Sequence, residues 1–143
     1  MSSASYFFAA PNDEVAASAI DGEMPPFVFA KRIDPFEAIP RVEGLLTGRS
    51  CDTIQREFIS KPPIAIDEGG EGFIAAMSEP LAAALASADR AQLADVAVSW
   101  AQIEEFEGRA QADGLADLLG ELADLVRRAD QQGHRIYCLF LAA

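Results

Sequence analysis

The sequence predicts an α+β fold, in which helices cover one small mixed sheet within a single domain of residues 1–143. Short runs rich in aromatic and β-branched residues alternate with longer segments whose apolar residues recur at helical spacing. Their order is strand, helix, strand, helix, then a hairpin, three helices and a last strand. Half of the 143 residues are apolar, which is enough for one domain with its own core.

The N-terminal region begins with an aromatic segment, residues 5–10, that is typical of a half-buried strand. A short helix is expected from there through Ile20, with Asn12 or Asp13 as its N-cap. Residues 27–30 form either a second strand or extended chain.

The segment 34–37 has Asp at a cap position, Pro at the first helical position and Glu three residues after the cap, which predicts a helix start. The helix is expected to run to Leu46, with Gly48 as its C-cap and with a kink or restart at Pro40. The stretch 50–58 fits no single pattern.

Residues 64–66 and 73–76 predict two short strands, joined as a hairpin by the glycine-rich loop 67–72. We expect no phosphate site in this loop. A P-loop needs Lys and Ser or Thr after its last glycine, whereas Phe73 follows here and the loop itself is acidic.

Three more helices follow. Ser78 and Asp89 are the predicted N-caps of the first two. The third has apolar residues at helical spacing over 115–129, with Arg127 and Arg128 expected in its last turn and Gly133 as its stop.

The final segment, residues 136–141, is apolar on both faces of a strand, which predicts a central place in the sheet. Its length is far below the ~20 residues of a membrane span. The N-terminus lacks the basic region and long apolar run of a secretory signal, and Cys51 and Cys138 are too few for a disulfide scaffold. We therefore expect a cytoplasmic protein with no membrane partner.

The net charge of −12 bears on the class of partner. Nucleic acid is disfavoured, because phosphate binding needs a positive surface. A basic protein partner is favoured by the negative field, although a solubility role alone also explains such a charge.

A candidate site arises where a predicted helix, residues 93–107, places Glu104 and Glu107 on the same face as Trp100. Carboxylates normally lie opposite the apolar face, and the helix dipole disfavours them near a C-terminus. Such a local conflict is typical of a functional site. Either both glutamates line an acidic pocket beside Trp100, or they reach solvent or pair with an arginine such as Arg109, Arg127 or Arg128.

No catalytic, metal or cofactor constellation joins these residues. His134 is the single histidine and would have to serve any Ser/His/Asp or Cys/His arrangement, and its pairing with Cys51 has no motif behind it. No second carboxylate–histidine motif completes a two-metal bundle. We expect no enzyme activity, no metal and no cofactor.

The leading hypothesis is a non-enzymatic acidic protein-binding module, like an immunity or inhibitor protein that neutralises a basic partner such as a toxin. Its expected contact residues are Trp100, Glu104, Glu105 and Glu107. One alternative is a small-molecule or hydrolytic pocket around Trp100, Glu104 and Glu107, with Tyr137 nearby. Another is a structural homodimer with Trp100 and the leucine-rich helix at its interface. The sequence leaves the oligomeric state open.

The C-terminal half also carries a resemblance. The strand 73–77 is followed by the segment 100–108 (Trp-Ala-Gln-Ile-Glu-Glu-Phe-Glu-Gly), the leucine-rich helix and the segment 133–138 (Gly-His-Arg-Ile-Tyr-Cys). This order resembles a group of short actinobacterial proteins and, more distantly, is similar to the YfbM-like bacterial family of unknown function. The resemblance covers roughly residues 73–141. It implies a fold class and a bacterial, cytosolic accessory protein, and it transfers no site residue.

Overall fold

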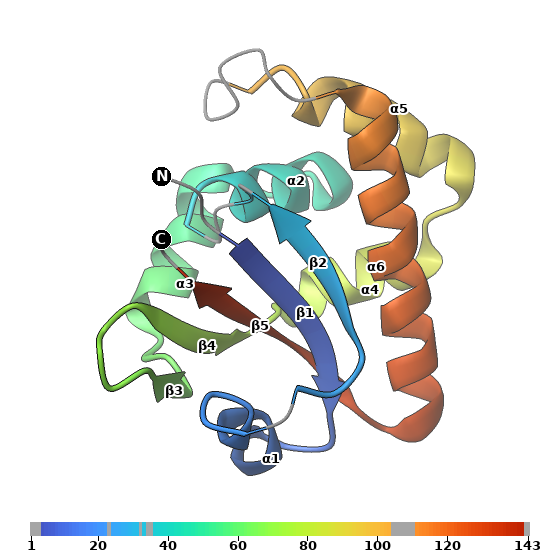
Figure 1. Ribbon diagram of the computed structural model, residues 1–143. Coiled ribbons are helices and arrows are strands. Elements are labelled where there is room, and N and C mark those ends of the chain that lie inside the picture. The colour runs from blue at the N-terminus through green and yellow to red at the C-terminus, as the bar shows by residue number, and fades with distance from the viewer. Residues whose placement is uncertain (1–3, 23, 32, 34–35, 104–110, 142–143) are drawn as a thin grey trace.

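The computed structural model describes residues 4–22, 24–31, 33, 36–103 and 111–141. Figure 1 shows helices packed against a sheet, an α+β fold as predicted. In chain order the elements are β1 (Ala4–Ala10), α1 (Asp13–Ser18), β2 (Phe27–Lys31), α2 (Ala38–Thr47), α3 (Cys51–Ser60), β3 (Ala65–Ile66), β4 (Gly72–Ala76), α4 (Glu79–Ser87), α5 (Arg90–Trp100), α6 (Ala112–Gln132) and β5 (Arg135–Leu141).

The sheet has five described strands in the order β2-β1-β5-β4-β3, so β5 is central, as its apolar character predicted. Every described pairing is antiparallel, whereas a mixed sheet was expected. The difference arises in the connection from β4 to β5. The 21 residues of α6 run back for roughly 32 Å and return the chain to the end where β4 finished. There the amide of Met77 donates to the carbonyl of Ile136 at 2.9 Å.

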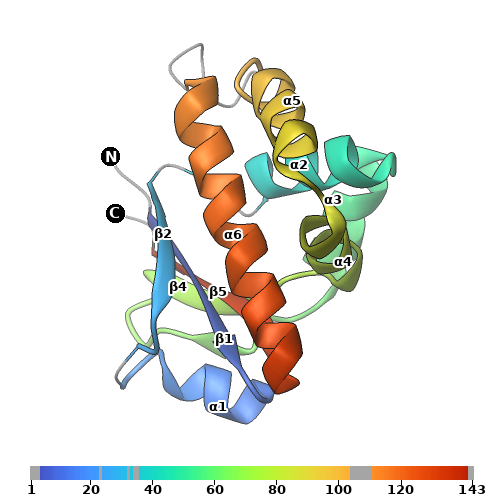
Figure 2. The same ribbon diagram turned by 90° about the vertical axis from the view of Figure 1, so that its right-hand side faces the viewer.

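One face of the sheet is covered by α2, α4, α5 and α6, and the main core lies between them. Figure 2 shows α6 lying across this face. The predicted apolar stripe of α6 is confirmed and points inward, because Leu115, Leu119, Leu122 and Val126 are all buried.

Among the described residues, the opposite face of the sheet is covered mainly by the short α1 and its flanking loop. A small second core there contains Phe8, Ile74 and Tyr137. The hydroxyl of Tyr137 donates to Oδ1 of Asp13 at 2.7 Å, which fixes α1 on the sheet. Burial, followed by this hydrogen bond, raises the pKa of Tyr137 to about 12.

The region around α2 differs from its prediction. The helix begins at Ala38, so Pro40 lies in its first turn, where a missing N–H costs nothing. Asp34 and Pro35 lie outside the described residues. Gly48 is the C-cap at φ 76°, as predicted. The unassigned stretch 50–58 belongs to helix α3, and residues 27–31 form a strand.

Three predicted N-caps are confirmed by their hydrogen bonds. Side-chain oxygens of Asn12, Ser78 and Asp89 accept from backbone amides at 2.9, 3.2 and 2.8 Å. The predicted place of Arg127 and Arg128 in the last turn of α6 is wrong, because the helix continues to Gln132. Arg127 instead donates to the carbonyls of Ala86 and Ala88, at the C-terminus of α4. A cation is favourable there because the helix dipole is negative at that end.

The hairpin between β3 and β4 is also confirmed. A turn links Asp67 to Gly70, whose φ is 71°. At Gly72, a Cβ atom would come within 2.7 Å of the carbonyl oxygen of Phe140. Only glycine therefore lets β4 approach β5 at this position.

Candidate interaction surface

Trp100 is not a surface residue. Its side chain is fully buried, and Nε1 donates to the carbonyl of Ala38 at 2.9 Å, which joins the end of α5 to the start of α2. The core uses both the rings and the polar atom of Trp100, so its burial argues against the expected direct contact with a partner, and that contact stays an untested prediction.

The predicted helix over 93–107 is too long. α5 ends at Trp100, and Gln102 and Ile103 then form i→i−3 hydrogen bonds typical of a closing turn. Glu104 and Glu107 would share a helix face with Trp100 only if the helix were continuous from 93 to 107. Glu104, Glu105 and Glu107 themselves, with Arg109, lie outside the described residues.

The two alternative functions, a small-molecule or hydrolytic pocket and a structural homodimer, each lose part of their structural support. Tyr137 lies on the α1 side of the sheet and Trp100 on the other, so they do not share a pocket. The leucine stripe of α6 is buried against the sheet and α5, and is therefore not available as a dimer interface.

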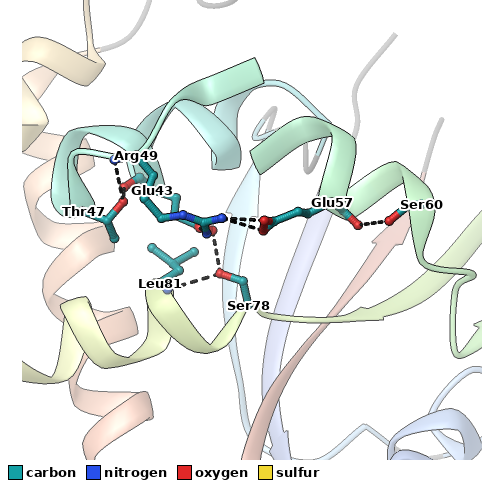
Figure 3. Close-up of polar contacts among 7 residues, drawn as sticks. All are labelled: Glu43, Thr47, Arg49, Glu57, Ser60, Ser78 and Leu81. Carbon is teal, nitrogen blue, oxygen red and sulfur yellow. Dashed lines mark hydrogen bonds and ion pairs between the residues drawn. The ribbon is translucent and has the colours of Figure 1, made fainter. Parts of the chain in front are cut away.

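A buried carboxylate that the sequence analysis missed lies on α2. Glu43 is only 2% exposed. Its carboxylate accepts from Ser78 Oγ at 2.6 Å and from Arg49 Nη1 at 3.2 Å. Figure 3 shows these residues together. Arg49 also donates to Glu57 on α3, at 2.8 Å to Oε1. The pKa of Arg49 is raised, first by its hydrogen bond to Glu57, while burial acts in the opposite direction.

This network is internal. It connects α2, α3 and the N-cap of α4, because Ser78 accepts from the amide of Leu81 while it donates to Glu43. A buried carboxylate with such partners is satisfied, and it serves the fold. The signal was present in the sequence, since Glu43 shares a helix face with Ile39, Val42 and Leu46, the same pattern that singled out Glu104.

A different set of carboxylates lies on the exposed face of α6. Asp113, Asp117, Glu121 and Asp124 are all exposed. Their spacings of four, four and three residues place them within about 80° of one another around the helix. We call this set the α6 stripe. Like charges at these spacings destabilise a helix by roughly 0.2–0.5 kcal/mol per pair. Asp113 lies in the first turn, where the helix dipole favours it, and Asp124 pairs with Arg127, so the repulsion falls mainly on Asp117 and Glu121.

The α6 stripe borders a groove beside strand β2, which lies next to α6 in Figures 1 and 2. Two hollows of about 260 and 400 Å³ adjoin there and share Phe29 and Glu121. The first extends toward Lys31 and Gly114, and the second toward Phe27 and Arg128. We call this feature the β2–α6 groove.

The β2–α6 groove is acidic in its middle and basic at its two ends. Asp117, Glu121 and Asp124 line its middle, whereas Lys31 and Arg128 line its two ends. Asp124 forms an ion pair with Arg127, in which Oδ1 and Nη1 are 3.5 Å apart. Within the part of the chain that the structure describes, Asp117 and Glu121 form no ion pair. These two carboxylates are therefore open to an external cation.

The described residues offer little support for a metal site or for a catalytic cysteine. Among the described residues, no group of three or more His, Cys, Asp or Glu side chains is placed to hold a metal ion. Figures 1 and 2 show α3, which begins at Cys51, well apart from the turn between α6 and β5 that holds His134. Cys138 is buried in β5, and burial raises the pKa of its thiol to about 12, which makes it a poor nucleophile.

No protein-family model, curated protein or solved structure matches this chain. The resemblance to the YfbM-like family therefore stays a prediction. In the described residues, no helix combines the length and the apolar character that crossing a bilayer requires.

Proposed function

We propose that this chain is a non-enzymatic acidic binding protein that engages a basic partner protein, as an immunity or inhibitor protein engages a toxin. The observation that carries the proposal is the α6 stripe, whose carboxylates at Asp117 and Glu121 face the β2–α6 groove and form no ion pair with a described residue, although Lys31 and Arg128 line the ends of the groove. The site differs from the one expected around Trp100, but the class of partner is the same.

The energetics of the helix support this. A row of like charges costs α6 stability, and a fold normally separates such charges or pairs them. Burying the row against a partner's lysines or arginines would turn the repulsion into attraction. The net charge of −12 would add long-range steering of a basic protein. The proposal places this encounter in the bacterial cytoplasm.

The test is an affinity capture with matched baits from lysate of the source organism. The baits are the wild-type chain, an Asp117→Lys/Glu121→Lys variant, and a Glu68→Lys/Glu71→Lys variant. The control changes the net charge equally, at the exposed β3–β4 loop, which lies at the edge of the sheet opposite β2. We expect wild type and control to retain the same basic protein, and the groove variant to lose it.

Salt provides an internal check on the same capture. The retained protein is expected to elute as the ionic strength rises, because exposed charge pairs are screened. The proposal is wrong if wild type retains no basic protein at low salt, or if the groove variant retains it as well as the control does.

A further inference from the structure

We infer that the β2–α6 groove accepts an extended segment of about six residues, with basic and apolar side chains in alternation, which adds to the sheet as a strand beside β2. The inference rests on the proposed function and specifies how the basic partner is held. It combines three features of the groove: an open strand edge, a matching length and two chemically different sides.

The open edge follows from the strand order. β2 is the outermost strand beside β1, so alternate residues of β2 direct their backbone N–H and C=O groups away from the sheet. Such an edge is a template for another strand, and folds commonly protect it. Here Phe27 and Phe29 on that edge remain 48% and 47% exposed. An added strand would satisfy the backbone groups and cover both rings.

The lengths of the two walls are similar. The hollows are lined on one side by the five residues of β2 and by Ile33, and on the other by residues of α6 between 114 and 128, with the low numbers of one wall opposite the high numbers of the other. At ~3.3 Å per residue, β2 itself is roughly 16 Å long, and at 1.5 Å per residue the α6 wall is roughly 21 Å long. These lengths hold about five or six residues of extended chain.

The two sides of an added strand would meet different surfaces. Val28 and Ala30 point to the helical side of β2, where the α6 stripe lies. Phe27 and Phe29 point to the other side, where both rings contact Tyr6 at centroid distances of 5.0 and 5.2 Å. Side chains of a strand alternate between the same two sides. Basic residues therefore suit one set of positions and apolar residues the other.

A second copy of this chain is a poor occupant. Pairing β2 with β2 would bring two α6 stripes to the same junction, and each copy already carries a net charge of −12. Like-charge juxtaposition at an interface is strongly unfavourable. Charge complementarity therefore selects a basic segment of another protein.

The test uses the full chain, labelled with ¹⁵N, and synthetic peptides of six residues in which lysine and valine alternate. Two matched peptides carry N-methyl groups, one on every lysine and the other on every valine. N-methylation removes the hydrogen-bond donors from one edge of the peptide and keeps all its charges. We expect at least one methylated peptide to bind about tenfold more weakly or worse, because backbone hydrogen bonds are lost.

Amide hydrogen exchange locates the bound peptide. We expect added protection at alternate residues of β2, and no change at β3 on the opposite edge of the sheet. If all three peptides bind equally and the Asp117→Lys/Glu121→Lys variant abolishes binding, the proposed function stands but strand addition is overturned.

Two other results would also overturn strand addition. One is the absence of binding by any peptide at about 1 mM, the weak limit of a specific site. The other is protection of β2 in the free chain that rises with protein concentration, because a second copy would then occupy the edge. The affinity capture decides the proposed function separately in both cases.

Discussion

Glu43 on α2 and Glu121 on α6 carry the same side chain in opposite surroundings. Glu43 is buried and accepts from Ser78 and Arg49, so its partners belong to the fold. Glu121 is exposed beside a groove, with like-charged neighbours on its own helix and no described ion pair. A carboxylate on an apolar helix face is an internal connector here, whereas neighbouring carboxylates on a polar face, two of them without a described ion pair, are the better sign of an external partner.

The largest expected effect comes from the internal site. Glu43→Ala leaves Arg49 and Ser78 without their shared acceptor, and we expect it to lower the free energy of unfolding by about 2–3 kcal/mol. Urea unfolding followed by circular dichroism measures this. Glu121→Ala is the matched control and should change stability by less than about 0.5 kcal/mol. Equal effects of the two variants would remove the distinction between the sites.

Trp100→Phe tests whether the tryptophan belongs to the internal set. The variant loses the hydrogen bond to Ala38 and some packing volume, so we expect a loss of about 1–2 kcal/mol in urea unfolding. Retention of the basic partner in the capture assay should be unchanged. A variant of wild-type stability that no longer retains the partner would instead restore Trp100 to the interface.

The third prediction concerns pH and the internal contact of α1. The pKa of Tyr137 is raised from 10.0 to about 12 in the folded chain, so the unfolded chain ionises first as the pH rises. Its stabilising contribution is complete below pH 10 and is lost between pH 10 and about 12. Unfolding midpoints across this range should fall less steeply for Tyr137→Phe than for wild type. Parallel curves would contradict the assignment.

The smallest effect on stability is expected at the external site. Asp117→Lys/Glu121→Lys removes like-charge neighbours from α6, so we expect a gain of up to about 0.5 kcal/mol at low salt. The gain should shrink in high salt because of screening. Thermal unfolding at two salt concentrations measures it. A clear loss of stability would show that the stripe serves the fold after all.

Local patterns predicted the elements well. The caps at Asn12, Ser78 and Asp89, the stop at Gly133 and the central β5 all follow from features within a few residues of chain. The end of α5 escaped prediction, because residues 101–103 contain no glycine or proline to mark it. The antiparallel pairing of β4 and β5 was not predicted either. It depends on the end of the sheet to which α4, α5 and α6 together bring the chain back.

The candidate site was less predictable than the fold. The β2–α6 groove joins segments roughly 90 residues apart, and no local pattern states that β2 lies at an edge next to α6. The spacing of the α6 stripe was readable from the sequence, but its relevance depends on what it faces. Trp100 was expected to contact a partner, whereas its burial agrees with its place in the apolar stripe of α5.

The most direct test is a ¹⁵N chemical-shift titration of the full chain with the alternating lysine–valine peptide. We expect shifts that saturate at β2 and along the α6 stripe, with Glu43, Arg49 and Ser78 unchanged. Shifts centred on the Glu43 network or on the β3–β4 edge, with β2 and the α6 stripe silent, would contradict it.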